Sequence, residues 1–358
     1  MWLLDPKIGQ LTGIIGLGIT IAISLRFAIS KNGAASLKEW KNAAIIWFFF
    51  SIFILSAGLA PGDINHILAS TAERFSHPLP IDNQLPFIFA QQVAEGRIQS
   101  PMVAGWLSSD RPPLQTAYFL ASGAVYLQDN DIHYQINGTL LQCLWIVALF
   151  ALLRSRNIER KTVAIVVAAS IFSGTSIVHG LFVWPKLFPV FFLIVTVDIA
   201  LRNNTFESKG WLAAAICGTS AALSMLCHGG SIFALIGLAA ALLVLRKTPN
   251  TSFVAITVFT FILLFVTWTS YQKFIDPPGD RLLKWHLAGV IPVDGRPFLR
   301  TLIDSYSKLN PTQILELKVS NFQVMLGNPK TWIPNMIQSS FGIGTINTRL
   351  NLRAEQFF

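Results

Sequence analysis

Residues 252–271, SFVAITVFTFILLFVTWTSY, decide the fold class of this chain. The stretch is apolar almost throughout and carries no charged side chain. An α-helix rises about 1.5 Å per residue, so about 20 such residues cross the roughly 30 Å hydrocarbon core of a bilayer. The stretch therefore predicts a transmembrane helix.

The composition of the whole chain supports the same class. Of its 358 residues, 53% are hydrophobic and only 13% are charged, whereas soluble domains carry roughly 25% charged residues. We therefore expect an all-α polytopic membrane protein whose main partner is the lipid bilayer. The net charge of +9 would indicate nucleic acid in a soluble chain, but here Lys and Arg flank predicted spans, and we expect no nucleic-acid partner.

About eight transmembrane helices are expected from the apolar runs. The runs are 9–29, 43–60, 134–153, 162–182, 186–201, 211–227, 230–246 and 252–271. The N-terminus, MWLLDPK, lacks the basic region of a cleavable signal peptide, so we expect the first run to be retained as a helix. The cysteines fall inside apolar runs and are expected to be small core residues, neither disulfide-bonded nor metal-binding. They are Cys143, Cys217 and Cys227.

Basic residues set the predicted topology through the positive-inside rule. The cluster from Arg154 to Lys161 belongs in the cytoplasm only if a single span separates it from residue 112. The short apolar stretch 113–128 is therefore expected to be interfacial or re-entrant. The resulting divisions are two spans in 1–60, an extracytoplasmic loop with juxtamembrane helices and the candidate site in 61–133, a transmembrane bundle in 134–271, and a partly amphipathic extracytoplasmic segment in 272–358.

This topology gathers the polar chemistry of the chain at the outer face. The residues expected there are Asp63, Asp82, Asp110, Arg111, Lys186, the segment 276–286, and the six histidines, His66, His77, His133, His179, His228 and His286. The histidines are scattered, with no pair at the spacing of a helical metal site. We therefore expect no metal and no other cofactor, although a divalent cation on aspartate is compatible with such a site.

Two outer segments carry the strongest signals. In PIDNQLPFIFAQQVAEG (80–96), Asp82 is either the N-cap of an interfacial helix or a general base at the membrane surface. In SSDRPPLQTAYFL (108–120), the two prolines fix Arg111 in extended backbone before a helix. Asp110 and Arg111 then form either a solvated pair that stops the helix or a site where Arg111 binds a lipid phosphate.

Together, these two segments resemble the first outer loop of type C glycosyltransferases. The nearest branch contains aminoarabinose transferases and protein O-mannosyltransferases. The resemblance implies that Asp82 is the catalytic carboxylate, that Arg111 contacts the phosphate of a polyprenyl-phosphate sugar, and that Asp110 orients the pocket. Two positions depart from the pattern: Asn83 replaces a glutamate, and Leu85 stands where an arginine often does. The chain ends at NLRAEQFF, which we expect of a fragment or a divergent short form.

Three further positions have two interpretations each. Lys186 is either an interfacial anchor beside Trp184 or a phosphate ligand. His228, with two glycines after it, marks either a tight outer hairpin or an imidazole facing the donor, with the glycines allowing close approach. The segment 276–290 is either an amphipathic helix on the membrane surface or part of a lid.

The leading hypothesis is a membrane glycosyltransferase of the cell envelope, in the bacterial inner membrane with its site on the periplasmic face. It would move a sugar from a polyprenyl-phosphate donor to an extracytoplasmic lipid, glycan or protein acceptor. The alternatives are a transporter or flippase for a lipid-linked anion, and an inactive lipid-binding relative. A transporter usually places ionisable groups within its spans, whereas the predicted spans here are nearly free of charge. Asp198, near a predicted cytoplasmic end, is the clearest exception, so the pattern favours surface chemistry over transport.

Overall fold

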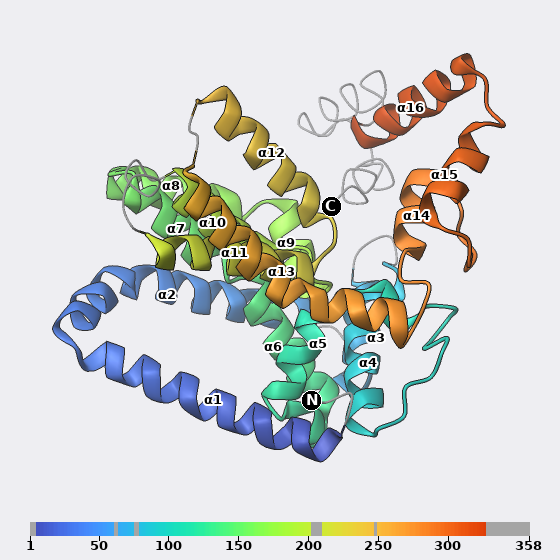
Figure 1. Cartoon of the computed structure of the whole chain (residues 1–358). Helices are drawn as coiled ribbons and strands as arrows, with labels where there is room; N and C mark the ends of the chain where they lie inside the picture. Colours follow the sequence, from blue (N-terminus) through green and yellow to red (C-terminus); the bar gives the residue numbers. More distant parts are fainter. Residues whose placement is uncertain (1–4, 61–63, 75–78, 202–209, 247–248, 327–358) are drawn as a thin grey trace, which may run out of the picture.

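The computed structural model describes residues 5–60, 64–74, 79–201, 210–246 and 249–326. Within these ranges the regular structure is helical, apart from an isolated antiparallel bridge between Val103 and Trp106. The expected all-helical class is confirmed for this part of the chain (Figure 1). Asp63, His77 and the end of the predicted outer segment, 327–358, lie outside the described residues.

The chain opens with two long apolar helices that form a hairpin (Figure 1). Helix α1 (Pro6–Ile29) begins where the Asp5 carboxylate accepts hydrogen bonds from the backbone N–H groups of the first turn. Its apolar side chains are exposed along its length. Helix α2 (Lys31–Leu59) instead buries Phe50 and Ile54 against the bundle. The first two apolar runs are helices, as expected.

Five helices form the centre of the bundle. Helix α6 (Asn130–Gln142) runs into α7 (Trp145–Ser155). Helix α11 (Trp211–Cys227) packs against both α10 (Phe188–Leu201) and α13 (Thr251–Phe274). Helix α12 (Ser231–Val244) leaves this centre and is exposed over most of its surface (Figure 1). The three cysteines are buried and free, as the sequence indicated.

The run 162–182 is not one straight helix. It forms α8 (Arg160–Ile171) and α9 (Gly174–Leu181), whose axes are bent by 61°. The cause is local: the Ser173 hydroxyl accepts a hydrogen bond from the Ser176 N–H at 3.3 Å and starts a new helix. Apolar content in the sequence does not reveal this break.

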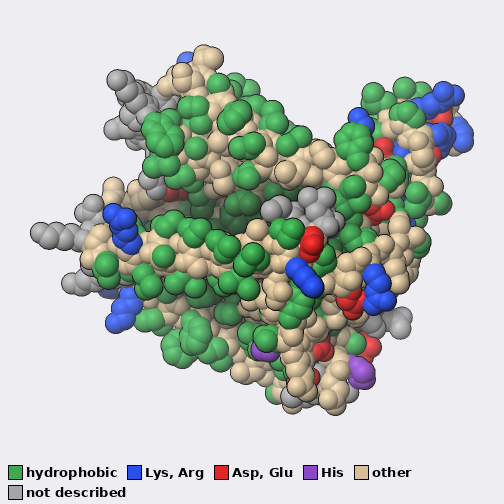
Figure 2. All heavy atoms as spheres, turned by 60° about the horizontal axis from the view of Figure 1, so that its bottom comes forward, with side chains coloured by type: hydrophobic (Ala, Val, Ile, Leu, Met, Phe, Trp, Pro, Cys, Tyr) green, Lys and Arg blue, Asp and Glu red, His purple; other side chains and the backbone are tan. Residues whose placement is uncertain are grey.

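In the described part of the chain, four helices are long and apolar enough to cross a membrane, or five if the bent pair counts as one span. They are α1, the part of α2 from Trp40 to Leu59, the continuous α6–α7 segment, and α13. Helices α10, α11 and α12 are apolar but shorter. Hydrophobic side chains cover much of the visible face of the molecule (Figure 2), which fits a lipid surrounding. The count of eight spans stays a prediction.

The loop between α2 and α6 folds into short helices. They are α3 (Ile67–Glu73), α4 (Leu85–Ala94) and α5 (Leu114–Ala121). Helix α5 has 8 residues and so reaches only about 12 Å, which agrees with the expectation that 113–128 does not cross. After α13 the chain continues as α14 (Arg281–Ala288), α15 (Phe298–Tyr306) and α16 (Pro311–Leu326), which extend away from the bundle (Figure 1).

Gly218 sets how closely α11 and α13 approach. A Cβ at this position would collide with the Thr257 carbonyl oxygen and the Thr260 hydroxyl. We expect Gly218→Ala to lower the free energy of unfolding by about 1–3 kcal/mol, because backbone of α13 must shift to make room. Unfolding in detergent measures the effect. Gly237→Ala on exposed α12, where a Cβ meets nothing within 4 Å, is the control; equal stability of the two variants would contradict this packing account.

Candidate active site

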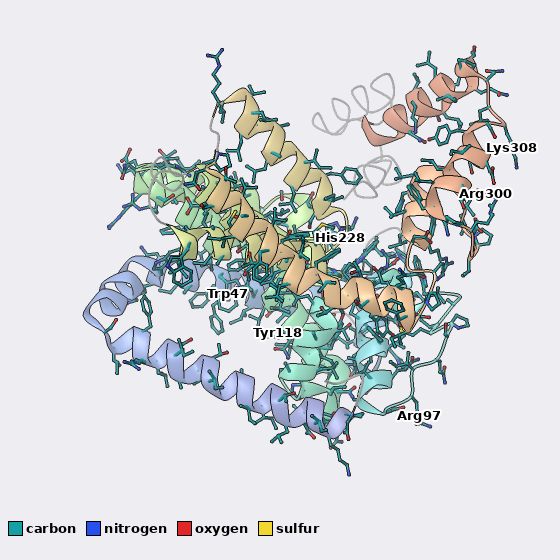
Figure 3. All side chains as sticks on the ribbon, in the orientation of Figure 1. Trp47, Arg97, Tyr118, His228, Arg300 and Lys308 are labelled. Atoms are coloured by element: carbon teal, nitrogen blue, oxygen red, sulfur yellow. The ribbon has the colours of Figure 1, made fainter. Side chains whose placement is uncertain are left out.

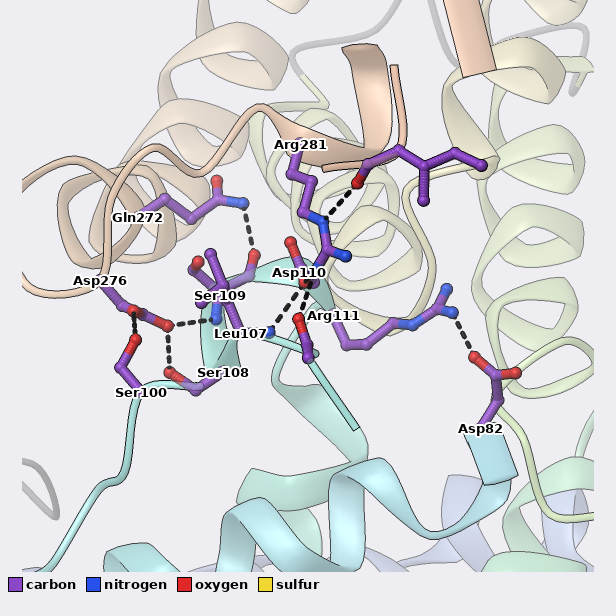
Figure 4. Close-up of polar contacts among 12 residues, drawn as sticks. Asp82, Ser100, Leu107, Ser108, Ser109, Asp110, Arg111, Gln272, Asp276 and Arg281 are labelled. Atoms are coloured by element: carbon purple, nitrogen blue, oxygen red, sulfur yellow. Dashed lines mark hydrogen bonds and ion pairs between the residues drawn. The ribbon is translucent and has the colours of Figure 1, made fainter. Parts of the chain in front are cut away.

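The polar residues gather at one end of the helices, where α13 finishes and the folded loop begins. Figure 4 shows this end, with Asp82, Asp110 and Arg111 from the loop and Arg281 from α14. Helix α6 also starts at this end, where its Tyr134 hydroxyl donates a hydrogen bond to the Asn83 carbonyl at 3.1 Å. The site is therefore built where several helix ends meet.

Asp82 lies on a single 3-10 turn, η2 (Ile81–Asn83), just before α4. The N-cap of α4 is Gln84, and Asp82 makes no capping hydrogen bond, so the capping interpretation is wrong. Instead the Asp82 carboxylate pairs with the Arg111 guanidinium. Their side chains are only 7% and 17% exposed, so the pair lies in a site largely closed to water.

Arg111 has the extended backbone that the following prolines predict, with φ −121° and ψ 131°. Its guanidinium lies between the rings of Trp106 and Trp184, at 4.4 Å and 4.8 Å from their centroids. Such stacking stabilises a cation and holds the planar group in one orientation. Within the described residues, Arg111 Nε is buried and has no hydrogen-bond partner.

Asp110 does not pair with its neighbour, so the interpretation of a solvated Asp110–Arg111 pair is wrong. Its Oδ2 accepts from Arg281 Nη1 at 2.8 Å and from the Leu107 N–H at 2.8 Å. The Asp110 carboxylate therefore joins α14 to the loop that carries Arg111. This placement is compatible with the orienting role that the family resemblance implies.

Asp276 ties the end of α13 to the same loop, a role that sequence analysis does not predict. Its carboxylate accepts from the Ser108 hydroxyl at 2.6 Å, the Ser109 N–H at 2.9 Å and the Ser100 hydroxyl at 3.0 Å. Gln272 adds a hydrogen bond to the Ser109 carbonyl at 3.0 Å (Figure 4). The many polar residues in 276–286 indicated that this segment belongs with the site, but they did not indicate which residues it contacts.

Lys186 is held in the cluster by its backbone. Three buried glutamines hold the segment between α9 and α10: Gln115 and Gln135 donate to the carbonyls of Val183 and Leu181, both at 2.7 Å, and Gln142 accepts from the N–H groups of Leu187 and Phe188. Lys186 Nζ lies 4.7 Å from the Trp184 ring, and its charge acts on Asp82. Lys186 therefore lies beside Trp184, as the anchor interpretation expects, and its charge also acts on Asp82, while its role as a phosphate ligand stays a prediction.

His228 ends α11 and begins the turn to α12, so the tight turn is confirmed, while its place at the outer face stays a prediction. Its Nδ1 accepts the Gly230 N–H at 3.0 Å, and its ring lies 6.3 Å from Trp184 (Figure 3). Burial, and then the charges of Lys186 and Arg111, lower the pKa of His228 to about 3, so the imidazole is neutral at pH 7. A Cβ at Gly230 would meet the His228 ring at 2.9 Å, whereas a Cβ at Gly229 would meet nothing within 4 Å, so only Gly230 is needed for the close approach of the ring.

Burial changes the acid–base character of the cluster. It raises the pKa of Asp82 above 3.8, although Arg111 and Lys186 act in the opposite direction. Burial likewise raises the pKa of Asp110 and lowers those of Arg111 and Lys186. A carboxylate whose pKa is raised by desolvation can accept a proton, and two cations beside it can bind an anion.

The other predicted outer-face histidines are dispersed. His66 ends a 3-10 turn before α3, His133 lies in the first turn of α6, and His179 is buried in α9. The charges of His179 and His286 act on His228. Across the ranges that the structure describes, no three His, Cys, Asp or Glu side chains are grouped as metal ligands would be.

Asp198 lies at the far end of α10 from this cluster. It is within 3.4 Å of Arg156 and accepts a hydrogen bond from the Ser155 hydroxyl at 2.8 Å.

Comparison with known proteins gives no family, curated protein or solved structure that matches this chain.

Proposed function

We propose that this chain is a membrane glycosyltransferase that moves a sugar from a polyprenyl-phosphate donor to an extracytoplasmic lipid, glycan or protein acceptor. One observation carries the proposal: the buried Asp82 carboxylate lies against Arg111, with Lys186 acting on it, at the ends of apolar helices. A polyprenyl chain lies in the bilayer and presents its phosphate at such an end. The arrangement supports the proposal because a base and two cations lie at the end of the helices where such a phosphate and its sugar would meet.

The chemistry assigns each charge a step. Asp82 accepts the proton of an acceptor hydroxyl or amine while the oxygen or nitrogen of that group bonds to the anomeric carbon. The bond from the anomeric carbon to the phosphate oxygen breaks, and the phosphate leaves with the electron pair. Arg111 and Lys186 stabilise this developing charge. The free Nε–H of Arg111 is a donor for a phosphate oxygen.

Asn83 bears on the alternative of an inactive relative. Its amide donates to the Leu68 carbonyl at 2.9 Å, and the side chain is fully buried. This residue therefore holds η2 against α3, and a carboxylate there would face a carbonyl oxygen without a donor. The replacement of glutamate thus has a structural reason and leaves Asp82 as the working carboxylate.

The transporter alternative has one observation in its favour, because the bent α8–α9 pair resembles the broken helices of transporters. The charged groups, however, lie in two sets at opposite ends of the bundle. Arg156 donates to the Leu201 carbonyl at the end of α10, whereas Lys186 precedes its start. The middle of the bundle offers no comparable set among the described residues, which favours surface chemistry over transport.

We also propose the topology that places this site outside the cytoplasm of a bacterial inner membrane, with eight crossings that include the short helices. The prediction is that Arg97→Cys reacts with an impermeant maleimide added to spheroplasts, whereas Glu159→Cys reacts only after the membranes are opened. Both positions are exposed and lie toward opposite ends of the bundle. Reaction of both from the same side would contradict the topology.

The function itself is tested with the full chain in liposomes. Vesicles receive polyprenyl-phosphate sugars and candidate acceptors, and release of polyprenyl phosphate is measured. The expected result is sugar-dependent release that the site variants described below abolish. No release with any donor class, although the chain is folded, would contradict the proposal.

A further inference from the structure

Helix α14 turns its charged side toward the protein and its apolar side outward. Arg281 is buried and pairs with Asp110 at 2.8 Å, and Lys284 is fully buried. Leu283 and Leu287, in contrast, are 52% and 42% exposed. An amphipathic helix on a water-soluble surface buries its apolar face, so this helix has the opposite orientation.

Helix α15 repeats the pattern. Its Thr301 is buried and donates to the Asp294 carboxylate at 2.8 Å. Its outward side is apolar, because the exposed side chains include Leu299 at 66% and Ile303 at 65%. Two successive helices with polar contacts inward and leucine or isoleucine outward indicate an apolar neighbour on their outer side.

We propose that the arm formed by α14 and α15 lies in the interface of a phospholipid bilayer, with Leu283, Leu287, Leu299 and Ile303 among the acyl chains. Interfacial helices bury their apolar face about 5–10 Å below the headgroups. The arm follows α13 directly, so it starts at the level where a spanning helix leaves the membrane. Arg281 ties the arm to Asp110, and Thr301 donates to Asp294 within the arm, so the apolar side is left for lipid.

Charge on the arm supports a lipid neighbour rather than a second protein. Arg300 and Lys308 lie on its outer part (Figure 3), where they can meet anionic headgroups. Arg300 and Lys308 are both exposed. A basic residue beside exposed leucine or isoleucine is the pattern of helices that bind anionic bilayers.

The test places an environment-sensitive NBD fluorophore on single cysteines in nanodiscs of phosphatidylcholine and phosphatidylglycerol. Leu299→Cys and Ile303→Cys report on the apolar side of α15. Arg300→Cys, on the same helix and also exposed, is the matched control. The chain without an introduced cysteine measures background labelling of the three buried native cysteines.

The expected result is a blue-shifted emission at 299 and 303 that doxyl-labelled lipids quench and aqueous iodide does not. The probe at 300 should show the reverse. Iodide quenching at 299 and 303 equal to that at 300 would overturn the proposal, since the face would then be in water. Protection from both quenchers would also overturn it, because protein, either residues 327–358 or a second copy, would then cover the face.

Discussion

Replacing Asp82 by Asn is expected to lower the rate of sugar transfer by about 10²–10⁴-fold, the usual contribution of a general base. The amide has nearly the same shape and can still accept a hydrogen bond from Arg111, but it cannot take a proton at neutral pH. The fold should therefore persist while transfer is lost. Single-turnover release of polyprenyl phosphate from the reconstituted chain measures the effect.

Asp304→Asn is the matched control for this loss. Asp304 also pairs with an arginine, Arg296, but the pair is exposed and lies on α15. Exposed pairs contribute at most about 1 kcal/mol, so stability and transfer should stay close to those of the unaltered chain. Equal transfer by Asp82→Asn and Asp304→Asn would remove Asp82 from the mechanism.

The pH profile gives a second measure of the same residue. Only the ionised Asp82 accepts a proton, so transfer falls as pH decreases through the pKa of Asp82. Because burial raises this pKa above 3.8, the acid limb should lie at a higher pH than that of a free aspartate. An acid limb at or below 3.8 would contradict the assignment of Asp82 as the base.

Replacing Arg111 by Ala is expected to lower transfer by about 10²–10³-fold, since the leaving phosphate loses a fixed cation. It should also lower the free energy of unfolding by about 3–5 kcal/mol, because Asp82 is left as an uncompensated buried charge. Arg111 lowers the pKa of Asp82, so its removal moves the acid limb to still higher pH. Transfer assays, denaturation and the pH profile check the three effects.

Two further variants separate the roles of Arg111. Arg111→Lys keeps the charge but loses the planar group between Trp106 and Trp184, so transfer should be intermediate. The double variant Asp82→Asn with Arg111→Ala removes both charges and should recover much of the stability without recovering transfer. Full transfer by Arg111→Ala would contradict a phosphate-binding role, whatever its stability.

The candidate site was predicted in part because its signals are local. The prolines after Arg111 restrict its backbone wherever the loop lies, and the basic cluster near Arg154 predicts how the helices are oriented in a membrane. Together these signals predict Asp82, Arg111, Lys186 and His228 on the same side. The structure brings these four residues into one cluster, although their chemical roles stay predictions.

Local signals did not identify the partners of each charge. Asp110 and Arg111 are adjacent in sequence and invite the interpretation of a pair, yet Asp110 pairs with Arg281, 171 residues away. Asp276 likewise joins Ser108 across 168 residues. Which charged groups meet depends on how the loop packs over the helix ends. The residue pattern of one sequence does not predict that packing.

The sequence by itself determined that the chain is helical and apolar enough for a membrane, because hydrophobicity and backbone preference act over a few residues. Only the tertiary structure decided which helices are long enough to cross, where α8 and α9 bend, and that Asp82 pairs with Arg111 instead of capping α4. The physical reason is burial. A carboxylate removed from water must find a partner, and the available partner is fixed by packing among segments that lie far apart in the chain.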